Sequence, residues 1–125
     1  MHARFLKLVE QARTRIQEVD VATVKRKLDR EEPFYLVDVR ESGEWDAGRL
    51  PQAVHLSKGL IEHDIERRIP DVDADIVCYC GGGYRSALVA ENLNRMGYRH
   101  VSSMAGGYHA WRQAGLPVDR EAPAS

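Results

Sequence analysis

The chain has 125 residues, of which 43% are hydrophobic and 30% charged, a composition typical of one globular domain. It contains no run of about 18 apolar residues, so a membrane-spanning segment is not expected. The formal net charge is -1 and the basic residues are scattered among acidic ones, which argues against a nucleic-acid-binding protein. The first 20 residues carry charges in every turn, unlike a secretory signal, so we expect a cytoplasmic protein.

The N-terminal part of the chain predicts two short helices. Apolar residues recur at helical spacing within residues 5–16, and this apolar face is expected to pack on its own domain. Asp20 is a candidate N-cap for a second helix through residues 21–30, which must end before Pro33.

Four short apolar runs predict strands, which we place at residues 34–39, 53–56, 75–79 and 100–104. A helix is predicted over residues 58–69, with Leu60 and three isoleucines on one side, and another over residues 86–97, closed by Gly97. Strands alternating with helices predict an α/β fold with a mainly parallel central sheet and helices on both faces. Ligand sites in such folds form at the carboxyl ends of the strands.

The segment CGGGYRS, residues 80–86, opens at the carboxyl end of the third predicted strand. Its three glycines can adopt positive φ angles that turn successive N–H groups inward, which forms a nest for an anion at the start of a helix. These donors would favour the reactive thiolate form of Cys80. Arg85 would add a fixed charge that could hold an oxyanion. The candidate site therefore has Cys80 as the nucleophile and Gly81, Gly82, Gly83, Tyr84, Arg85 and Ser86 as substrate-binding residues.

A plain strand-to-helix turn with a buried cysteine is the alternative interpretation of this segment, and the cysteine at its head favours the reactive one. Cys78 lies inside an apolar strand and is expected to be a packing residue. A disulfide between Cys78 and Cys80 would close a very short ring, so both thiols are expected to be free. No CxxC or HxxxH pair occurs among the cysteines and histidines, so no metal site is expected.

The loop CGGGYRS resembles the active-site loop of rhodanese-like domains. Residues 38–56, DVRESGEWDAGRLPQAVHL, and residues 105–118, AGGYHAWRQAGLPV, resemble two further family segments in the same order. Arg49 and Gln52 stand where histidine and glycine are frequent in the family. The resemblance spans about residues 20–118 and implies a single rhodanese-like domain at residues 19–119. The N-terminal helix, at residues 1–18, lies outside this family core, and residues 120–125 are expected to form a disordered tail.

Several polar and aromatic residues outside the loop are expected to be structural. Asp38, Arg40 and Glu44 are predicted to form an ion-pair network that supports the loop, as the resemblance also implies. Three aromatic residues, Trp45, Tyr108 and Trp111, are expected to be packing residues, and His109 to be structural or solvated.

The resemblance implies a sulfurtransferase. Cys80 would take a sulfane sulfur from thiosulfate or a persulfide donor, hold it as a persulfide and pass it to cyanide or a thiol, with no metal or organic cofactor. Two alternatives stay open: a persulfide carrier or regulatory module that acts on a partner protein, and a cysteine phosphatase or arsenate reductase. The resemblance implies six residues from Cys to Arg in sulfurtransferases and one more in the related phosphatases, and Cys80 to Arg85 spans six. The sequence leaves the physiological donor and acceptor and the oligomeric state open.

Overall fold

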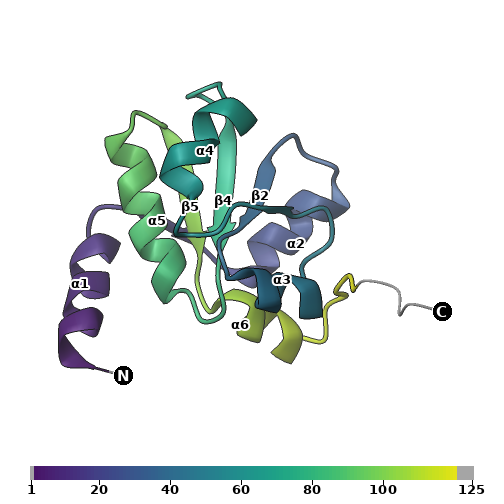
Figure 1. Ribbon diagram of the computed structural model, residues 1–125. Coiled ribbons are helices and arrows are strands. Elements are labelled where there is room, and N and C mark those ends of the chain that lie inside the picture. Colours follow the sequence, from purple (N-terminus) through teal and green to yellow (C-terminus); the bar gives the residue numbers. More distant parts are fainter. Residues whose placement is uncertain (1, 121–125) are drawn as a thin grey trace.

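A five-stranded sheet with only parallel pairings forms the centre of the fold (Figure 1). The computed structural model describes residues 2–120. The strand order is β1-β5-β4-β2-β3. The strands are β1 (Gln17–Val19), β2 (Tyr35–Asp38), β3 (Val54–His55), β4 (Asp75–Tyr79) and β5 (His100–Met104). The helices are α1 (Ala3–Arg13), α2 (Val21–Asp29), α3 (Ser42–Ala47), α4 (Ile61–Arg68), α5 (Tyr84–Arg95) and α6 (Gly107–Gln113).

Helices cover both faces of the sheet, which confirms the predicted α/β architecture (Figure 1). Successive residues of a strand point to opposite faces, and β4 shows this directly. Ile76, Cys78 and the following Cys80 belong to a hydrophobic cluster with α4 and α5, whereas Val77 and Tyr79 belong to a second cluster with α2 and α6. The central strand is therefore buried on both sides, and its carboxyl end delivers Cys80 directly beneath α5.

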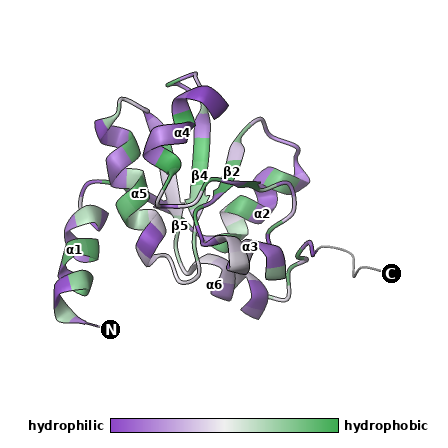
Figure 2. Cartoon of the chain, in the orientation of Figure 1, coloured by the Kyte–Doolittle hydropathy of each residue, from purple (hydrophilic) through white to green (hydrophobic). Residues whose placement is uncertain are grey.

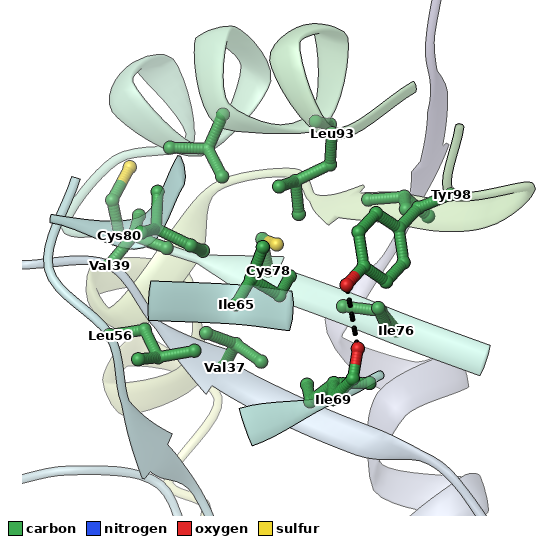
Figure 3. Close-up of a cluster of buried hydrophobic side chains, with 14 residues drawn as sticks. Val37, Val39, Leu56, Ile65, Ile69, Ile76, Cys78, Cys80, Leu93 and Tyr98 are labelled. Atoms are coloured by element: carbon green, nitrogen blue, oxygen red, sulfur yellow. Dashed lines mark hydrogen bonds between the residues drawn. The ribbon is translucent and has the colours of Figure 1, made fainter. Parts of the chain in front are cut away.

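Figure 3 shows the first cluster, in which Cys78 lies among aliphatic side chains while Cys80 lies at the margin. The Tyr98 hydroxyl donates to the carbonyl oxygen of Ile69 at 2.6 Å, which satisfies the phenol inside this cluster. Such pairing removes the cost of burying an O–H group without a partner.

The N-terminal helix packs on its own domain, as its apolar face predicts. Val9 and Ala12 are fully buried where α1 meets α5, whereas Leu8 is half exposed. The colouring of Figure 2 shows the corresponding division of α1 into apolar and polar patches. The predicted N-cap of α2 is also confirmed, because the Asp20 carboxylate accepts the Thr23 N–H at 2.8 Å.

The strand β1 and the helix α3 were not predicted, and the helix predicted from residue 58 begins later. β1 has three residues with largely exposed side chains and gains its order by pairing with β5 across the expected boundary between residues 18 and 19. α3 is only six residues long and depends on a capping box between Glu41 and Glu44. The helix predicted from residue 58 begins at Ile61, and Leu60 is 57% exposed rather than packed.

At the other end of the chain, Arg49 and Asp119 form an isolated antiparallel bridge, with N to O distances of 2.9 and 2.7 Å. Of the tail expected at residues 120–125, residues 121–125 lie outside the described residues. None of the helices within residues 2–120 is both long and apolar enough to cross a membrane.

Candidate active site

The sulfur of Cys80 lies at the start of α5 and accepts hydrogen bonds from that helix. The Gly83 N–H donates to Sγ at 3.1 Å and the Ser86 N–H at 3.4 Å, and Ser86 Oγ lies 3.5 Å away. Gly83 is the N-cap residue and has no side chain to cap the helix, so the cysteine sulfur takes the place of a capping acceptor. Donors at a helix N-terminus stabilise negative charge on the atom they face.

Only one glycine of the loop provides the positive φ angle that the sequence predicted for all three. Gly83 has φ of 91°, whereas Gly81 and Gly82 lie outside the left-handed region. These two glycines serve a different purpose, because a Cβ on Gly81 would lie 3.2 Å from Arg85 Nη2 and one on Gly82 would lie 3.3 Å from the Tyr84 ring. Fewer backbone N–H groups than expected therefore surround the sulfur, namely those of Gly83 and Ser86. Gly81 and Gly82 instead leave room for the side chains of Arg85 and Tyr84.

Arg85 is paired rather than free. Its Nη1 and Nη2 donate to the two carboxylate oxygens of Glu44 at 2.8 and 3.1 Å. Hydrogen bonds from Arg85 hold the pKa of Glu44 below its usual range, so this ion pair persists at neutral pH. The positive charge of Arg85 at the rim of the loop is thus neutralised by the carboxylate of Glu44.

Asp38 and Arg40 form the predicted ion pair, but Glu44 is not part of it. The Arg40 guanidinium donates to both oxygens of Asp38 and to the Gly48 carbonyl, entirely inside the protein. The Tyr79 hydroxyl donates to Asp38 at 2.7 Å and accepts the Leu50 N–H at 3.1 Å, and burial raises the pKa of Tyr79, so it remains a neutral donor. This network fixes the chain before α3, while Glu44 projects separately toward the loop.

The aromatic residues differ in how far they are buried. Trp111 is completely buried in the second cluster, as expected, whereas Trp45 is only partly buried and stacks on His55, with 5.0 Å between the ring centroids. The Arg40 guanidinium lies 4.1 Å from the centroid of the Tyr108 ring.

Helix α6 holds the loop from the other side. The Tyr108 N–H donates to the Cys80 carbonyl at 2.7 Å and the His109 N–H to the Gly81 carbonyl at 2.9 Å. Gly107 permits this approach, because a Cβ there would clash with the Cys80 carbonyl oxygen. The backbone of Cys80 is thereby fixed by elements far apart in the sequence.

Two residues that contact the site were not predicted. Ser103 on β5 is fully buried, and its hydroxyl lies 2.8 Å from that of Ser86, next to the cysteine. The pair of serines inside an otherwise apolar strand was the available signal. Arg13 of α1 donates to the Gly83 carbonyl at 3.4 Å, with its guanidinium 5.1 Å from the Tyr84 ring centroid, and no sequence pattern pointed to it.

The two cysteines have different surroundings. Both are free thiols, and both are almost inaccessible to solvent. Burial raises the pKa of Cys78 to about 12, so this side chain stays a thiol among apolar neighbours. Within residues 2–120, no group of three His, Cys, Asp or Glu side chains is arranged to hold a metal ion.

The structure is that of a parallel α/β domain with a candidate nucleophilic cysteine at the end of a strand. Backbone N–H groups at the start of the next helix face the sulfur of this cysteine. The family model described as the rhodanese-like domain matches residues 20–114. The chain therefore belongs to the rhodanese-like domain family, as its motifs predicted.

The similar proteins cover most of this chain. The sulfurtransferase of Allochromatium vinosum is 35% identical over 103 residues, which are 82% of this chain and 94% of the relative. The thiosulfate sulfurtransferase GlpE of Pseudoalteromonas translucida is 32% identical, with 78% and 90% of the two chains covered. Among solved structures, a Rhodopseudomonas palustris protein of unknown function, described as a possible tyrosine phosphatase, has a TM-score of 0.82 and 28% identity over 92% of this chain and 93% of its own.

Proposed function

We propose that this protein transfers a sulfane sulfur through a persulfide on Cys80. The observation that carries the proposal is the pair of N–H groups, from Gly83 and Ser86, that face Cys80 Sγ. Such donors stabilise a thiolate, the form in which cysteine is a nucleophile. Gly81, Gly82, Tyr84 and Arg85 complete the loop that would surround the transferred sulfur.

In the first half-reaction, the Cys80 thiolate attacks the outer sulfur of thiosulfate. A bond forms between Sγ and that sulfur, the S–S bond of thiosulfate breaks, and sulfite leaves with the bonding electron pair. Because Cys80 is only 1% exposed, a small donor is favoured in this step. Arg85 could hold the departing anion while Glu44 shares its charge.

In the second half-reaction, a thiophilic acceptor takes the outer sulfur. Cyanide or a thiolate attacks that sulfur, the bond to Sγ breaks, and the Cys80 thiolate is regenerated. The persulfide carries the reactive sulfur outward from a nearly closed position, which makes it accessible to the acceptor. The protein alternates between two covalent states, so ping-pong kinetics are expected, and the cycle uses no metal or organic cofactor.

The name of the GlpE relative supports thiosulfate as a donor, since that protein is a thiosulfate sulfurtransferase and is similar over most of this chain. The unpaired thiols of Cys78 and Cys80 suit a reducing compartment, and we propose that the protein acts in the cytoplasm.

A persulfide carrier that passes sulfur to a partner protein would use the same first half-reaction. The two functions differ in the acceptor: fast transfer to a protein thiol with a high KM for thiosulfate would favour the carrier.

A phosphatase is the second candidate, because the structurally similar Rhodopseudomonas palustris protein is described as a possible one. The six residues from Cys80 to Arg85 give the shorter of the two loop lengths that the family resemblance implies. Hydrolysis of p-nitrophenyl phosphate, lost in Cys80→Ser, would favour the phosphatase.

The direct test is intact-protein mass spectrometry after treatment with thiosulfate and then with cyanide. The wild-type protein should gain the mass of one sulfur atom, and cyanide should remove it. Cys80→Ser should show no gain. If Cys80→Ser is folded and still gains sulfur, the assignment of the nucleophile is wrong.

Cys78→Ser is the matched control variant, because it removes the neighbouring thiol from the same strand. It should load and release sulfur, since the Cys78 thiol has a pKa of about 12 and faces apolar side chains. A buried hydroxyl at this position should lower the free energy of unfolding by about 1–3 kcal/mol, which urea denaturation would measure.

A further inference from the structure

A cleft of about 390 Å³ lies beside the cysteine loop, between Gly81 and α6. Gly81, Tyr108, His109, Arg112 and Gln113 line it. This volume falls in the range of small-molecule sites, which is about 300–1,000 Å³, and is more than thiosulfate would need. The cleft therefore has room for a larger second substrate.

The cleft and the loop form one unit, because they share Gly81. The His109 N–H donates to the Gly81 carbonyl at 2.9 Å, and the neighbouring Tyr108 N–H donates to the Cys80 carbonyl at 2.7 Å. A molecule seated in the cleft is thus held by the same helix that fixes the backbone of the nucleophile. Gly81 is the lining residue next to Cys80 in the chain, so the reactive end of the molecule has to approach the outer sulfur of a persulfide past Gly81.

The side chains of the cleft favour an anion. Arg112 carries a fixed charge, His109 and Gln113 offer N–H donors, and no carboxylate lines the cleft. All three side chains are exposed and available to a ligand. Within residues 2–120, no ion pair involves Arg112 or His109, whereas Arg85 is paired with Glu44.

We propose that this cleft is the acceptor subsite and that it binds the carboxylate of a small organic thiol, with Arg112 as its main recognition residue. The inference rests on the proposed persulfide cycle. Arg112 and the N–H donors of His109 and Gln113 hold the carboxylate while the thiolate of the same molecule attacks the outer persulfide sulfur. A new S–S bond forms on the acceptor, the bond to Sγ breaks, and Cys80 leaves as a thiolate, so no oxidant or reductant is needed.

Three small thiols that differ in charge test this proposal: 3-mercaptopropionate, 2-mercaptoethanol and cysteamine. Protein loaded with sulfur from thiosulfate would be mixed with each thiol, and loss of the persulfide followed by intact-protein mass spectrometry. For each thiol, the rate constant of a variant is divided by that of the wild type, which cancels the intrinsic reactivity of the thiol. Transfer to cyanide is measured in parallel as a reaction that needs no carboxylate.

Arg112→Gln should slow transfer to 3-mercaptopropionate about threefold to fivefold more than transfer to 2-mercaptoethanol, the size expected for one exposed ion pair. Of the three thiols, cysteamine should show the smallest decrease in its transfer rate between the wild type and Arg112→Gln. His109→Gln should have a smaller effect in the same order. Arg112→Lys keeps the charge and should restore most of the preference. Added salt should reduce the preference in the wild type, because it screens exposed charges.

Arg30→Gln is the matched control. Arg30 follows α2 shortly before β2 begins, at the amino ends of the strands, whereas the cysteine loop lies at their carboxyl ends. It is exposed and forms no ion pair within residues 2–120. Arg30→Gln should leave all three rates unchanged. Equal effects of Arg112→Gln on the three thiols, with normal loading and cyanide transfer, would overturn the subsite but leave the persulfide cycle intact. A wild-type protein that cannot be loaded would overturn both.

Discussion

The carboxylate of Glu44 and the guanidinium of Arg85 form a bidentate ion pair that joins α3 to the start of α5. The pair lies against Gly81, since Arg85 Nη2 is the nearest atom to the position of a Cβ there and a Glu44 oxygen lies 3.9 Å from it. An anionic sulfur donor that approaches this rim meets a cation already shared with a carboxylate. In the proposed reaction, Glu44 would therefore compete with the anionic donor for Arg85.

Replacing Glu44 with glutamine should strengthen the binding of thiosulfate. The amide can keep one hydrogen bond to Arg85 and can accept the Glu41 N–H that Glu44 accepts now, but it removes the negative charge. We expect KM for thiosulfate to fall about threefold at low salt, with little change in kcat, as for the loss of one partly exposed charge. A rise in KM would show that Glu44 instead holds Arg85 in its binding position.

The same ion pair predicts how stability depends on pH. Hydrogen bonds from Arg85 lower the pKa of Glu44 in the folded protein, so its contribution is present above the unfolded pKa, about 4.3, and is lost as the pH falls through the folded value. The free energies of unfolding of wild type and Glu44→Gln should differ by a constant amount from about pH 7 to 5 and converge at lower pH. Urea denaturation at each pH measures the difference, and a constant difference down to pH 2 would contradict it.

Gly107→Ala should disturb the loop, because the new Cβ would meet the carbonyl oxygens of Cys80 and Gly81. Gly97→Ala is the matched control: Gly97 also has a positive φ, but nothing lies within 4 Å of its Cβ position. Both variants should lose about 1 kcal/mol from backbone strain, and Gly107→Ala about 1–3 kcal/mol more. Only Gly107→Ala should slow persulfide formation, by about tenfold or more, since it displaces the nucleophile. Equal stability and loading in the two variants would contradict the close approach.

Gln52→Gly should stabilise the protein. Gln52 stands where the family often has glycine, and its φ of 66° lies in the left-handed region. Glycine removes that strain at some cost in chain entropy, so we expect a net gain of about 0.5–1 kcal/mol in the free energy of unfolding. The control Gln11→Gly, in the last turn of α1, should lose up to about 1 kcal/mol because that backbone is helical. A loss at Gln52 would mean that its side chain makes a contribution larger than the strain.

The long apolar strands and amphipathic helices were predictable because their patterns are local. β4 and β5 fall at the predicted residues, and Asp20 caps α2 as expected. β1 and α3 were not predictable by the same means. β1 has three residues and becomes a strand only by pairing with β5, and α3 is held by its capping box and by the ion pair of Glu44.

The family, the α/β fold and the position of Cys80 at the end of a strand could be predicted from the sequence, because they depend on motifs and periodicities along the chain. The contacts around the candidate site became known from the three-dimensional packing. The packing pairs Arg85 with Glu44, places the hydroxyl of Ser103 against that of Ser86, and brings Arg112 and His109 into a cleft beside Gly81. These contacts join residues from different elements, and their distances depend on how the helices pack against the sheet, which no local pattern encodes.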